Sequence, residues 1–443
     1  MGVMPVGRLL INMSLPMMAS MLVMALYNVV DSMFVSRISE HALTALSMAF
    51  PVQNLMIAIS AGLGVGLNAV LSRALGAKDH RAVKRAAANG VFILLLCALA
   101  FMLVGATCVR PYFMAQTGIA EIVEGGVLYT TIVTVGSLGL FMQILFERLL
   151  QSTGRTVLAM TSQITGAVIN IVMDPILIFG LLGFPKMGVA GAALATIMGQ
   201  WIGAGVGLYM CLKKNTEIPL AFRGFRPHKE TIGRILTIGV PSVIMQSIGS
   251  VMTFLMNQIL IAFSSTAVAV FGVYFKLQSF VFMPIFGMNN GTVPIVAYNY
   301  GARRADRMMK AIRYSITAAI TIMIGVLLVF HLATEPLLGI FDASEEMLRI
   351  GVPALRIISL SFPVAGFCIG CGTVFQALGY SIYSMINSLV RQLVVLIPSA
   401  FVIGRMTGDV TRVWYAFVIA EVFSLLLSVV FMKRIYRNVI SKI

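Results

Sequence analysis

Two carboxylates stand inside long apolar stretches of this chain, where an ionised group is costly. Asp31 follows an uncharged run from Leu9 to Val30, which is long enough to cross a bilayer core as a helix. Ionisable groups inside membrane spans usually mark ion, proton or substrate pathways. Helical spacing places Tyr27 and Asn28 on the same face as Asp31. The alternative is an interfacial carboxylate that water solvates near the helix end.

The second acid, Asp174, ends a polar stripe in the segment TSQITGAVINIVMDPILIF, in which Ser162, Gly166 and Asn170 recur every fourth residue. The proline that follows Asp174 cannot donate a backbone hydrogen bond, which leaves a carbonyl oxygen free beside the carboxylate. Two acids, an amide oxygen and a free carbonyl suit a hard cation, or a pair of acids that shares one proton.

A hydroxyl at Thr196 is predicted at the same depth, because Thr196 lies about 15 Å along the next apolar helix from its outer end. Counting helical rise from the loops places Asp31, Asn170, Asp174 and Thr196 in the outer half of the membrane. For Thr196 the alternative is a hydroxyl that merely hydrogen-bonds to its own helix backbone.

The elements that must position these residues are membrane helices. Hydrophobic residues make up 59% of the 443 residues and charged residues 11%, and the mean hydropathy is +0.95. This composition excludes a soluble protein and predicts an all-α polytopic membrane protein. Twelve apolar segments are expected near 10–36, 46–72, 88–109, 125–147, 157–184, 187–212, 235–263, 269–299, 312–333, 350–377, 383–404 and 411–432.

The net charge of +16 is distributed unevenly over the loops. Basic residues gather in alternate connections, which include 73–85, Arg148 and Arg155, 213–234, 303–313 and the tail from Lys433. The positive-inside rule therefore predicts a multi-pass protein of the plasma (inner) membrane with both termini in the cytoplasm. The basic loops are expected to face anionic lipid headgroups, with no nucleic acid as partner.

The chain repeats itself with an offset of 225 residues. Pro16 matches Pro241, Gln53 matches Gln278 and Gly76 matches Gly301, and the polar stretch 213–234 lies between the halves. This predicts two six-helix lobes, 1–222 and 223–443, related by a pseudo-two-fold axis along the membrane normal. Such lobes are typical of transporters that alternate access to a central cavity.

The repeat fails at the acids. Asp31, Asn170, Asp174 and Thr196 correspond to Met256, Val395, Ser399 and Glu421, so an ion site is expected in the amino-terminal lobe alone. Glu421 is expected either to neutralise Arg391 on the neighbouring helix or to act in transport. The candidates for a substrate cavity are the polar residues Tyr27, Asn28, Gln53, Gln278, Asn289 and Glu421.

Catalytic motifs are missing. The chain has no HExxH, no GxSxG and no phosphate-binding loop, and its histidines fall in or near predicted loops. The pair Cys368 and Cys371 lacks the second pair that a zinc site requires. We therefore expect no enzyme, no cofactor, and no metal beyond Na+ at Asp31, Asn170, Asp174 and Thr196.

The stretches YNVVDSMFVS, NIVMDPILIF and GVAGAALAT, with the paired G-A-[KR] loops, resemble the multidrug and toxic compound extrusion (MATE) transporters over essentially the whole chain. The resemblance implies a twelve-helix antiporter that exports cationic or amphipathic compounds in exchange for Na+ or H+. In one branch of the family the cation-site positions fall on Asp31, Asn170, Asp174 and Thr196. We expect a monomer whose partners are such compounds and membrane lipids.

The alternative within the wider superfamily is a flippase for lipid-linked oligosaccharides. That function requires several basic side chains facing a wide cavity to bind pyrophosphate. Lys276, Arg356 and Arg391 are the only candidates inside the apolar segments, which is too few to favour it. The sequence leaves open whether Na+ or H+ is the coupling ion, because the same carboxylates serve either.

Overall fold

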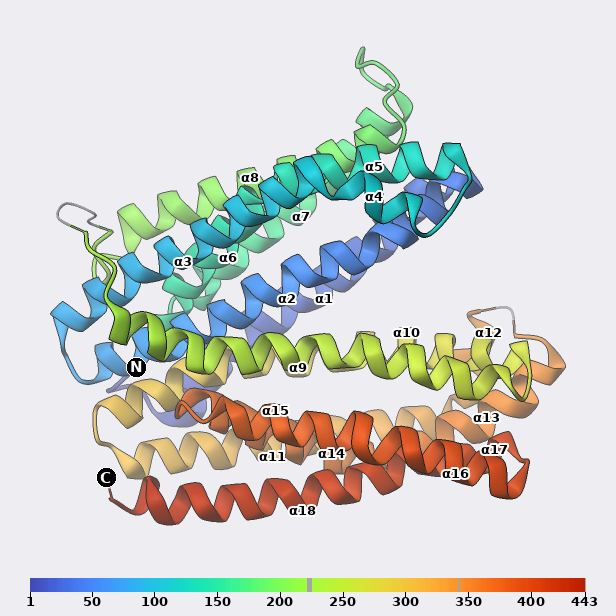
Figure 1. The fold of residues 1–443 in the computed structure, drawn as a ribbon. Helices are drawn as coiled ribbons and strands as arrows, with labels where there is room; N and C mark the ends of the chain where they lie inside the picture. The colour runs from blue at the N-terminus through green and yellow to red at the C-terminus, as the bar shows by residue number, and fades with distance from the viewer. Residues whose placement is uncertain (221–224, 342, 443) are drawn as a thin grey trace.

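The computed structural model describes residues 1–220, 225–341 and 343–442, and its regular elements are helices (Figure 1). The first half contains α1 (Val6–Ser36), α2 (Glu40–Gly76), α3 (His80–Thr107), α4 (Val109–Met114), α5 (Ala120–Val135), α6 (Leu138–Ser152), α7 (Thr156–Phe179) and α8 (Val189–Lys214). The second half contains α9 (Lys229–Ile261), α10 (Ser265–Gly301), α11 (Ala305–Leu332), α12 (Thr334–Gly339), α13 (Glu345–Ser359), α14 (Phe362–Ala377), α15 (Ser381–Leu389), a π-helical segment (Val390–Leu396), α16 (Ile397–Thr407), α17 (Val410–Val413), α18 (Tyr415–Asn438) and a 3₁₀ turn (Ile440–Lys442).

The prediction of twelve membrane spans is confirmed. Ten helices of the described residues are long and apolar enough to cross a bilayer. Two bent pairs, α5 with α6 at 43° and α13 with α14 at 48°, complete the set when each pair is counted as one span. The bend falls at the same place in both halves of the chain.

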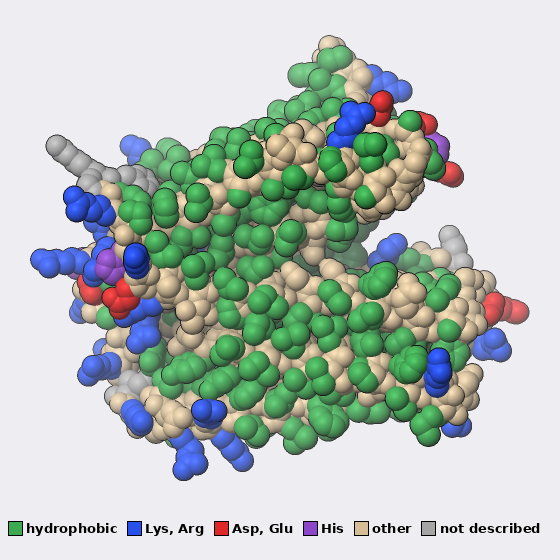
Figure 2. Space-filling model, viewed as in Figure 1, with side chains coloured by type: hydrophobic (Ala, Val, Ile, Leu, Met, Phe, Trp, Pro, Cys, Tyr) green, Lys and Arg blue, Asp and Glu red, His purple; other side chains and the backbone are tan. Residues whose placement is uncertain are grey.

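The two lobes, α1–α8 and α9–α18, pack against each other at one end and diverge at the other (Figure 1). Both chain termini lie at the end where the lobes meet. In the space-filling view, apolar side chains cover the visible sides of both lobes, and most Lys and Arg side chains gather at the closed end (Figure 2). A cleft between the lobes opens at the opposite end (Figure 2).

The helix boundaries in the two halves of the chain show the same offset of 225 residues as the sequence repeat. The pairs α2 and α10, α3 and α11, and α4 and α12 each begin and end 225 residues apart. The N-cap serines of α2 and α10, Ser39 and Ser264, accept equivalent hydrogen bonds from the backbone amides of Ala42 and Ala267. Local chain geometry is therefore duplicated together with the sequence.

The lobes contact each other through reciprocal backbone packing. A Cβ atom on Gly76 would overlap the carbonyl oxygen of Tyr298, and a Cβ atom on Gly301 would overlap that of Arg73. Arg73 and Tyr298 are themselves related by the 225-residue offset, so one contact is the two-fold image of the other. Only glycine allows α2 and α10 to approach this closely.

The remaining contacts between the lobes follow the same symmetry. Helix α1 packs along α10, and α2 packs along α9. Four long helices thus form the interface, and they connect the closed end to the walls of the cleft.

Candidate functional site

The two acids singled out from the sequence lie together in the amino-terminal lobe. Asp31, near the end of α1, and Asp174, on α7, have neighbouring side chains. Asp174 is completely buried, and Asp31 is partly buried. Both oxygens of Asp174 and Oδ1 of Asp31 have no hydrogen-bond partner among the residues that the structure describes. Within the described residues neither acid forms an ion pair with Lys, Arg or His, so a buried negative charge here needs a cation or a proton.

Asn170 and Thr196 lie together on the neighbouring surfaces of α7 and α8. Asn170 Nδ2 donates a hydrogen bond of 3.3 Å to Thr196 Oγ1, and Thr196 Oγ1 donates one of 3.0 Å to the carbonyl of Ala192. The local backbone bond expected as the alternative for Thr196 therefore coexists with the contact to Asn170. Asn170 Oδ1 is buried and has no hydrogen-bond partner in the described part of the chain, which leaves an amide oxygen available near the acids.

Two of the predicted cavity residues join this group. The Tyr27 hydroxyl, from α1, lies against Thr196. Gln53 Nε2, from α2, donates a hydrogen bond of 2.9 Å to the hydroxyl of Tyr129, which also lies against Thr196. Tyr129, on α5, was missed by the sequence analysis, because a single tyrosine in an apolar span carries no distinguishing pattern. Side chains from α1, α2, α5, α7 and α8 thus surround one polar centre.

Asn28, next to Tyr27 on α1, is exposed. Gln278 and Asn289 lie on α10, and Glu421 lies on α18, all in the carboxy-terminal lobe. Asn289 Oδ1 is buried and accepts no hydrogen bond from any described residue, whereas Gln278 is half-buried. The predicted cavity residues therefore come from both lobes.

The carboxy-terminal lobe has an ion pair in place of the acid pair. Arg391 Nη1 lies 3.5 Å from Glu421 Oε2, as expected from their charges, and the Glu421 side chain is 8% exposed. Arg391 belongs to the π-helical segment, and its repeat counterpart is Gly166. π-Helical turns are rare and often occur where a helix must accommodate an unusual side chain or function. The Arg391–Glu421 pair supplies its own cation, which the Asp31–Asp174 pair lacks.

A hydrogen bond one turn away confirms that these two regions are equivalent. Asn387 Nδ2 donates to Ser428 Oγ at 3.0 Å in the carboxy-terminal lobe. At the matching positions, Ser162 Oγ donates to the carbonyl of Gly203 at 2.8 Å. The scaffold is therefore shared, and the charged groups built on it differ.

A second polar cluster, on α6, corrects the sequence analysis. Arg148 was expected in a loop, but it lies within α6 and is 8% exposed. Its Nη1 donates hydrogen bonds to Gln151 Oε1 at 2.8 Å and to Asn290 Oδ1 at 3.0 Å. Glu147, also buried, accepts a hydrogen bond of 3.2 Å from Gln143 Nε2. The predicted span 125–147 includes residues 143 and 147 but ends just before Arg148 and Gln151, although the polar spacing of residues 143, 147 and 151 indicates that the helix continues.

Among the described residues no group of three or more His, Cys, Asp and Glu side chains comes together as a metal site would require. Any cation between Asp31 and Asp174 would be held by two carboxylates and by neutral oxygens. That donor set suits Na+ and does not suit a tightly held transition metal.

Comparison with known families identifies the chain. The MatE family model matches residues 16–176 and 241–402. The chain belongs to this family. The two matched segments begin at Pro16 and Pro241, 225 residues apart, so each lobe carries one copy of the family unit.

The relatives agree with this assignment. The chain is 25% identical over 415 residues to the multidrug export protein MepA of Staphylococcus saprophyticus, covering 93% of this chain and 90% of the relative. It is 23% identical over 399 residues to a FAD transporter of Shewanella oneidensis, covering 89% and 88%.

The solved structures show the same fold. An outward-facing multidrug resistance MATE transporter of the MOP superfamily has a TM-score of 0.92 at 26% identity, covering 98% of this chain and 96% of that one. A MOP superfamily transporter from Pyrococcus furiosus has a TM-score of 0.88 at 27% identity, covering 96% and 95%. This MATE protein is a multi-pass membrane transporter of small organic compounds, and it is not an enzyme.

Proposed function

We propose that this MATE protein is a secondary antiporter that exports cationic or amphipathic organic compounds in exchange for Na+ or H+. Asp31 and Asp174 form the coupling site, with Asn170 and Thr196 at its edge. The observation that carries the proposal is that two neighbouring carboxylates on different helices, one completely and one partly buried, form no ion pair with a cationic side chain of the described residues. Only a mobile cation or a proton can balance such a pair.

The position of α1 links this site to the conformation of the whole protein. α1 packs against α7 within its own lobe and against α10 of the other lobe. A bound Na+ or a shared proton draws Asp31 and Asp174 together, whereas two unbalanced carboxylates repel each other. Binding and release of the ion therefore change the packing of α1 against α7. Because α1 also packs against α10, the same movement alters the contact between the lobes.

The cleft opens to the outside in this conformation. Lys and Arg side chains gather at the closed end, and the positive-inside rule assigns that end to the cytoplasm of the plasma membrane, together with both termini (Figure 2). Asp31 and Asp174 lie toward the open end of α1 and α7, where an ion from outside can reach them.

The charged groups favour cations as substrates over lipid-linked pyrophosphates. Each of the three basic residues that a flippase would use is already engaged. Arg391 pairs with Glu421, Arg356 Nε donates to Thr334 Oγ1 at 3.3 Å, and Lys276 Nζ lies 5.9 Å from the centre of the Phe341 ring. The relative named as a FAD transporter nevertheless makes an anionic substrate the second candidate.

The test is efflux of a fluorescent organic cation from loaded vesicles, with Na+ and pH gradients imposed separately. Asp31→Asn and Asp174→Asn each remove one charge at nearly constant volume, and each is expected to abolish gradient-driven efflux while insertion and folding persist. Asp306→Asn, which neutralises an exposed acid in the first turn of α11, is the matched control and should transport normally.

Normal coupled efflux by both variants would contradict the site assignment. Gradient-driven transport of FAD in place of the cation would overturn the substrate class and leave the coupling site intact.

A further inference from the structure

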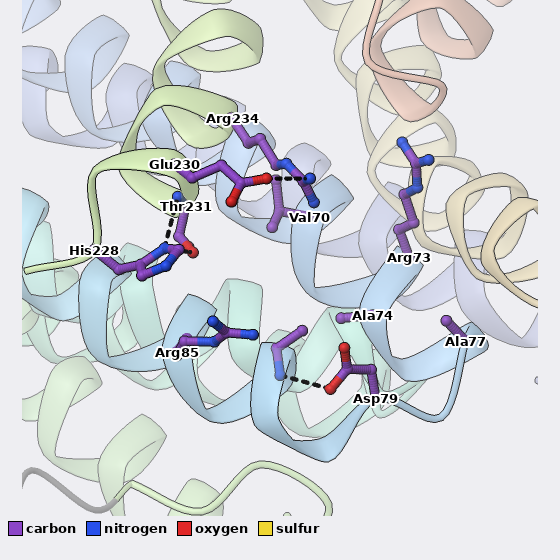
Figure 3. A pocket seen from close by; sticks show the side chains of 11 residues that line it. Val70, Arg73, Ala74, Ala77, Asp79, Arg85, His228, Glu230, Thr231 and Arg234 are labelled. Atoms are coloured by element: carbon purple, nitrogen blue, oxygen red, sulfur yellow. Dashed lines mark hydrogen bonds and ion pairs between the residues drawn. The ribbon is translucent and has the colours of Figure 1, made fainter.

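A pocket of about 300 Å³ lies between the lobes at their closed end (Figure 3). The end of α2 and the start of α3 form its amino-terminal wall, and the start of α9 forms the opposite wall. Its lining consists of Val70, Arg73, Ala74, Ala77, Asp79, Ala82, Arg85, His228, Glu230, Thr231 and Arg234. The transport site is far from this pocket, at the other end of the helices.

Three guanidinium groups and two carboxylates line the pocket, so it carries a net positive charge. Arg234 Nη2 lies 2.6 Å from Glu230 Oε1 in an ion pair, and Asp79 Oδ1 accepts hydrogen bonds from the backbone amides at the start of α3. Arg85 extends toward the space beneath the Glu230–Arg234 pair, with Asp79 across the gap (Figure 3). Within the described part of the chain Arg85 forms no ion pair with an acid.

The third arginine, Arg73, stacks on a residue of the other lobe. Its guanidinium carbon lies 4.5 Å from the centre of the Tyr300 ring. This contact holds the charge at the side of the pocket without neutralising it. An anion in the pocket therefore meets cationic groups from both lobes.

The other half of the chain shows why the pocket exists. The repeat counterpart of Ala82 is Arg307, whose Nη2 donates to the carbonyls of Met1 at 3.0 Å and Met4 at 2.6 Å. Its neighbour Arg304 donates to the carbonyl of Gly2 at 3.1 Å. In that half an arginine side chain crosses the gap and ties α11 to the segment before α1. In the amino-terminal half only the methyl group of Ala82 is present, and the gap stays open.

We propose that this pocket binds the phosphate group of an anionic membrane phospholipid. The pocket lies at the cytoplasmic end of the helices, where anionic headgroups concentrate, and guanidinium groups bind phosphate through paired charge-assisted hydrogen bonds. A phosphate held by Arg85 of one lobe and Arg234 of the other bridges the lobes. Its binding therefore stabilises the conformation that is closed at this end. Free phosphate offers the same chemistry without the acyl chains.

Lipid binding to the purified full-length protein tests the proposal. Native mass spectrometry counts bound phosphatidylglycerol, and thermal unfolding is followed with phosphatidylglycerol, phosphatidylcholine or inorganic phosphate added. Phosphatidylglycerol is expected to raise the unfolding temperature more than phosphatidylcholine does. Arg85→Gln and Arg234→Gln should each weaken phosphatidylglycerol binding by about tenfold or more, the effect of one lost charge-assisted hydrogen bond. A response to inorganic phosphate equal to that of the lipid would identify free phosphate as the source.

Two further variants make the test specific. Lys84→Gln removes the same charge from an exposed neighbour of Arg85 that does not line the pocket, and it should bind lipid as the parent does. Ala82→Arg installs the side chain found in the other half. It should raise the unfolding temperature without lipid and abolish the response to phosphatidylglycerol. An unchanged lipid response in Arg85→Gln, Arg234→Gln and Ala82→Arg would overturn the proposal.

Discussion

Arg148 of α6 and Asn290 of α10 join the two lobes through a hydrogen bond of 3.0 Å between Arg148 Nη1 and Asn290 Oδ1. Arg148 is buried, and its other Nη1 acceptor, Gln151, belongs to its own lobe. Opening the closed end must break this bond and leave a buried guanidinium with one acceptor fewer. Leaving a buried donor without its acceptor costs about 1–3 kcal/mol of free energy, so the bond favours the conformation described here.

Asn290→Ala is therefore expected to shift the protein toward opening at the cytoplasmic end, by roughly tenfold in the equilibrium constant. The measurement is the distance between spin labels placed on the exposed residues Lys78 and Arg303. Asn289→Ala is the matched control, because it removes a neighbouring amide whose Oδ1 has no hydrogen-bond partner within residues 1–220, 225–341 and 343–442. Equal shifts in the two variants would show that the Arg148 bond has no part in closure.

The glycine contacts at the same end give a second prediction. Gly76→Ala and Gly301→Ala place a methyl group on the carbonyl oxygen of Tyr298 or Arg73, and the backbone cannot yield. Each variant should separate α2 from α10 and lower thermal stability, measured by the unfolding temperature in detergent. Gly325→Ala, where a Cβ atom meets nothing within 4 Å, should be neutral or should stabilise by about 0.5–1 kcal/mol. Similar losses in all three variants would rule out close packing as the cause.

A substitution at Thr196 is expected to weaken ion binding with little effect on folding stability. Thr196→Val preserves side-chain shape and removes the hydroxyl that accepts a hydrogen bond from Asn170. We expect the half-saturating concentration of the coupling ion to rise several-fold, with stability lowered by about 1 kcal/mol at most. Thr161→Val, which loses only an exposed helix hydroxyl bonded to its own backbone, should leave transport unchanged. Unaltered ion dependence in Thr196→Val would exclude the hydroxyl from the site.

The Arg391–Glu421 pair is predicted to stabilise the carboxy-terminal lobe. Glu421→Gln leaves Arg391 without its counter-charge and should lower stability by roughly 3 kcal/mol. The transport rate, measured against Na+ concentration and pH, should show the same ion dependence as the parent protein, because the proposed coupling acids Asp31 and Asp174 lie in the other lobe. The double variant Arg391→Met with Glu421→Gln should recover stability. A changed ion dependence with normal expression would move the coupling site to Glu421.

The sequence by itself determined the architecture. Twelve spans can be read from hydropathy because the length of an apolar segment depends only on the residues within it. The repeat can be read because both lobes keep the same glycines and prolines, and the structure places Gly76 and Gly301 in equivalent contacts. Asp31 and Asp174 could be picked out because an acid in an apolar segment is conspicuous wherever the segment packs.

Tertiary packing decided the rest. Tyr129 and Gln53 meet only because α2 and α5 lie side by side, and no local pattern records that contact. The sequence predicts Arg148 to lie in a loop, whereas the structure shows that it hydrogen-bonds to an acceptor on the opposite lobe. The pocket at Ala82 likewise depends on the tertiary structure. The repeat shows that an arginine is missing there, but only the packing of α9 against α2 and α3 decides that the space it would fill is left open.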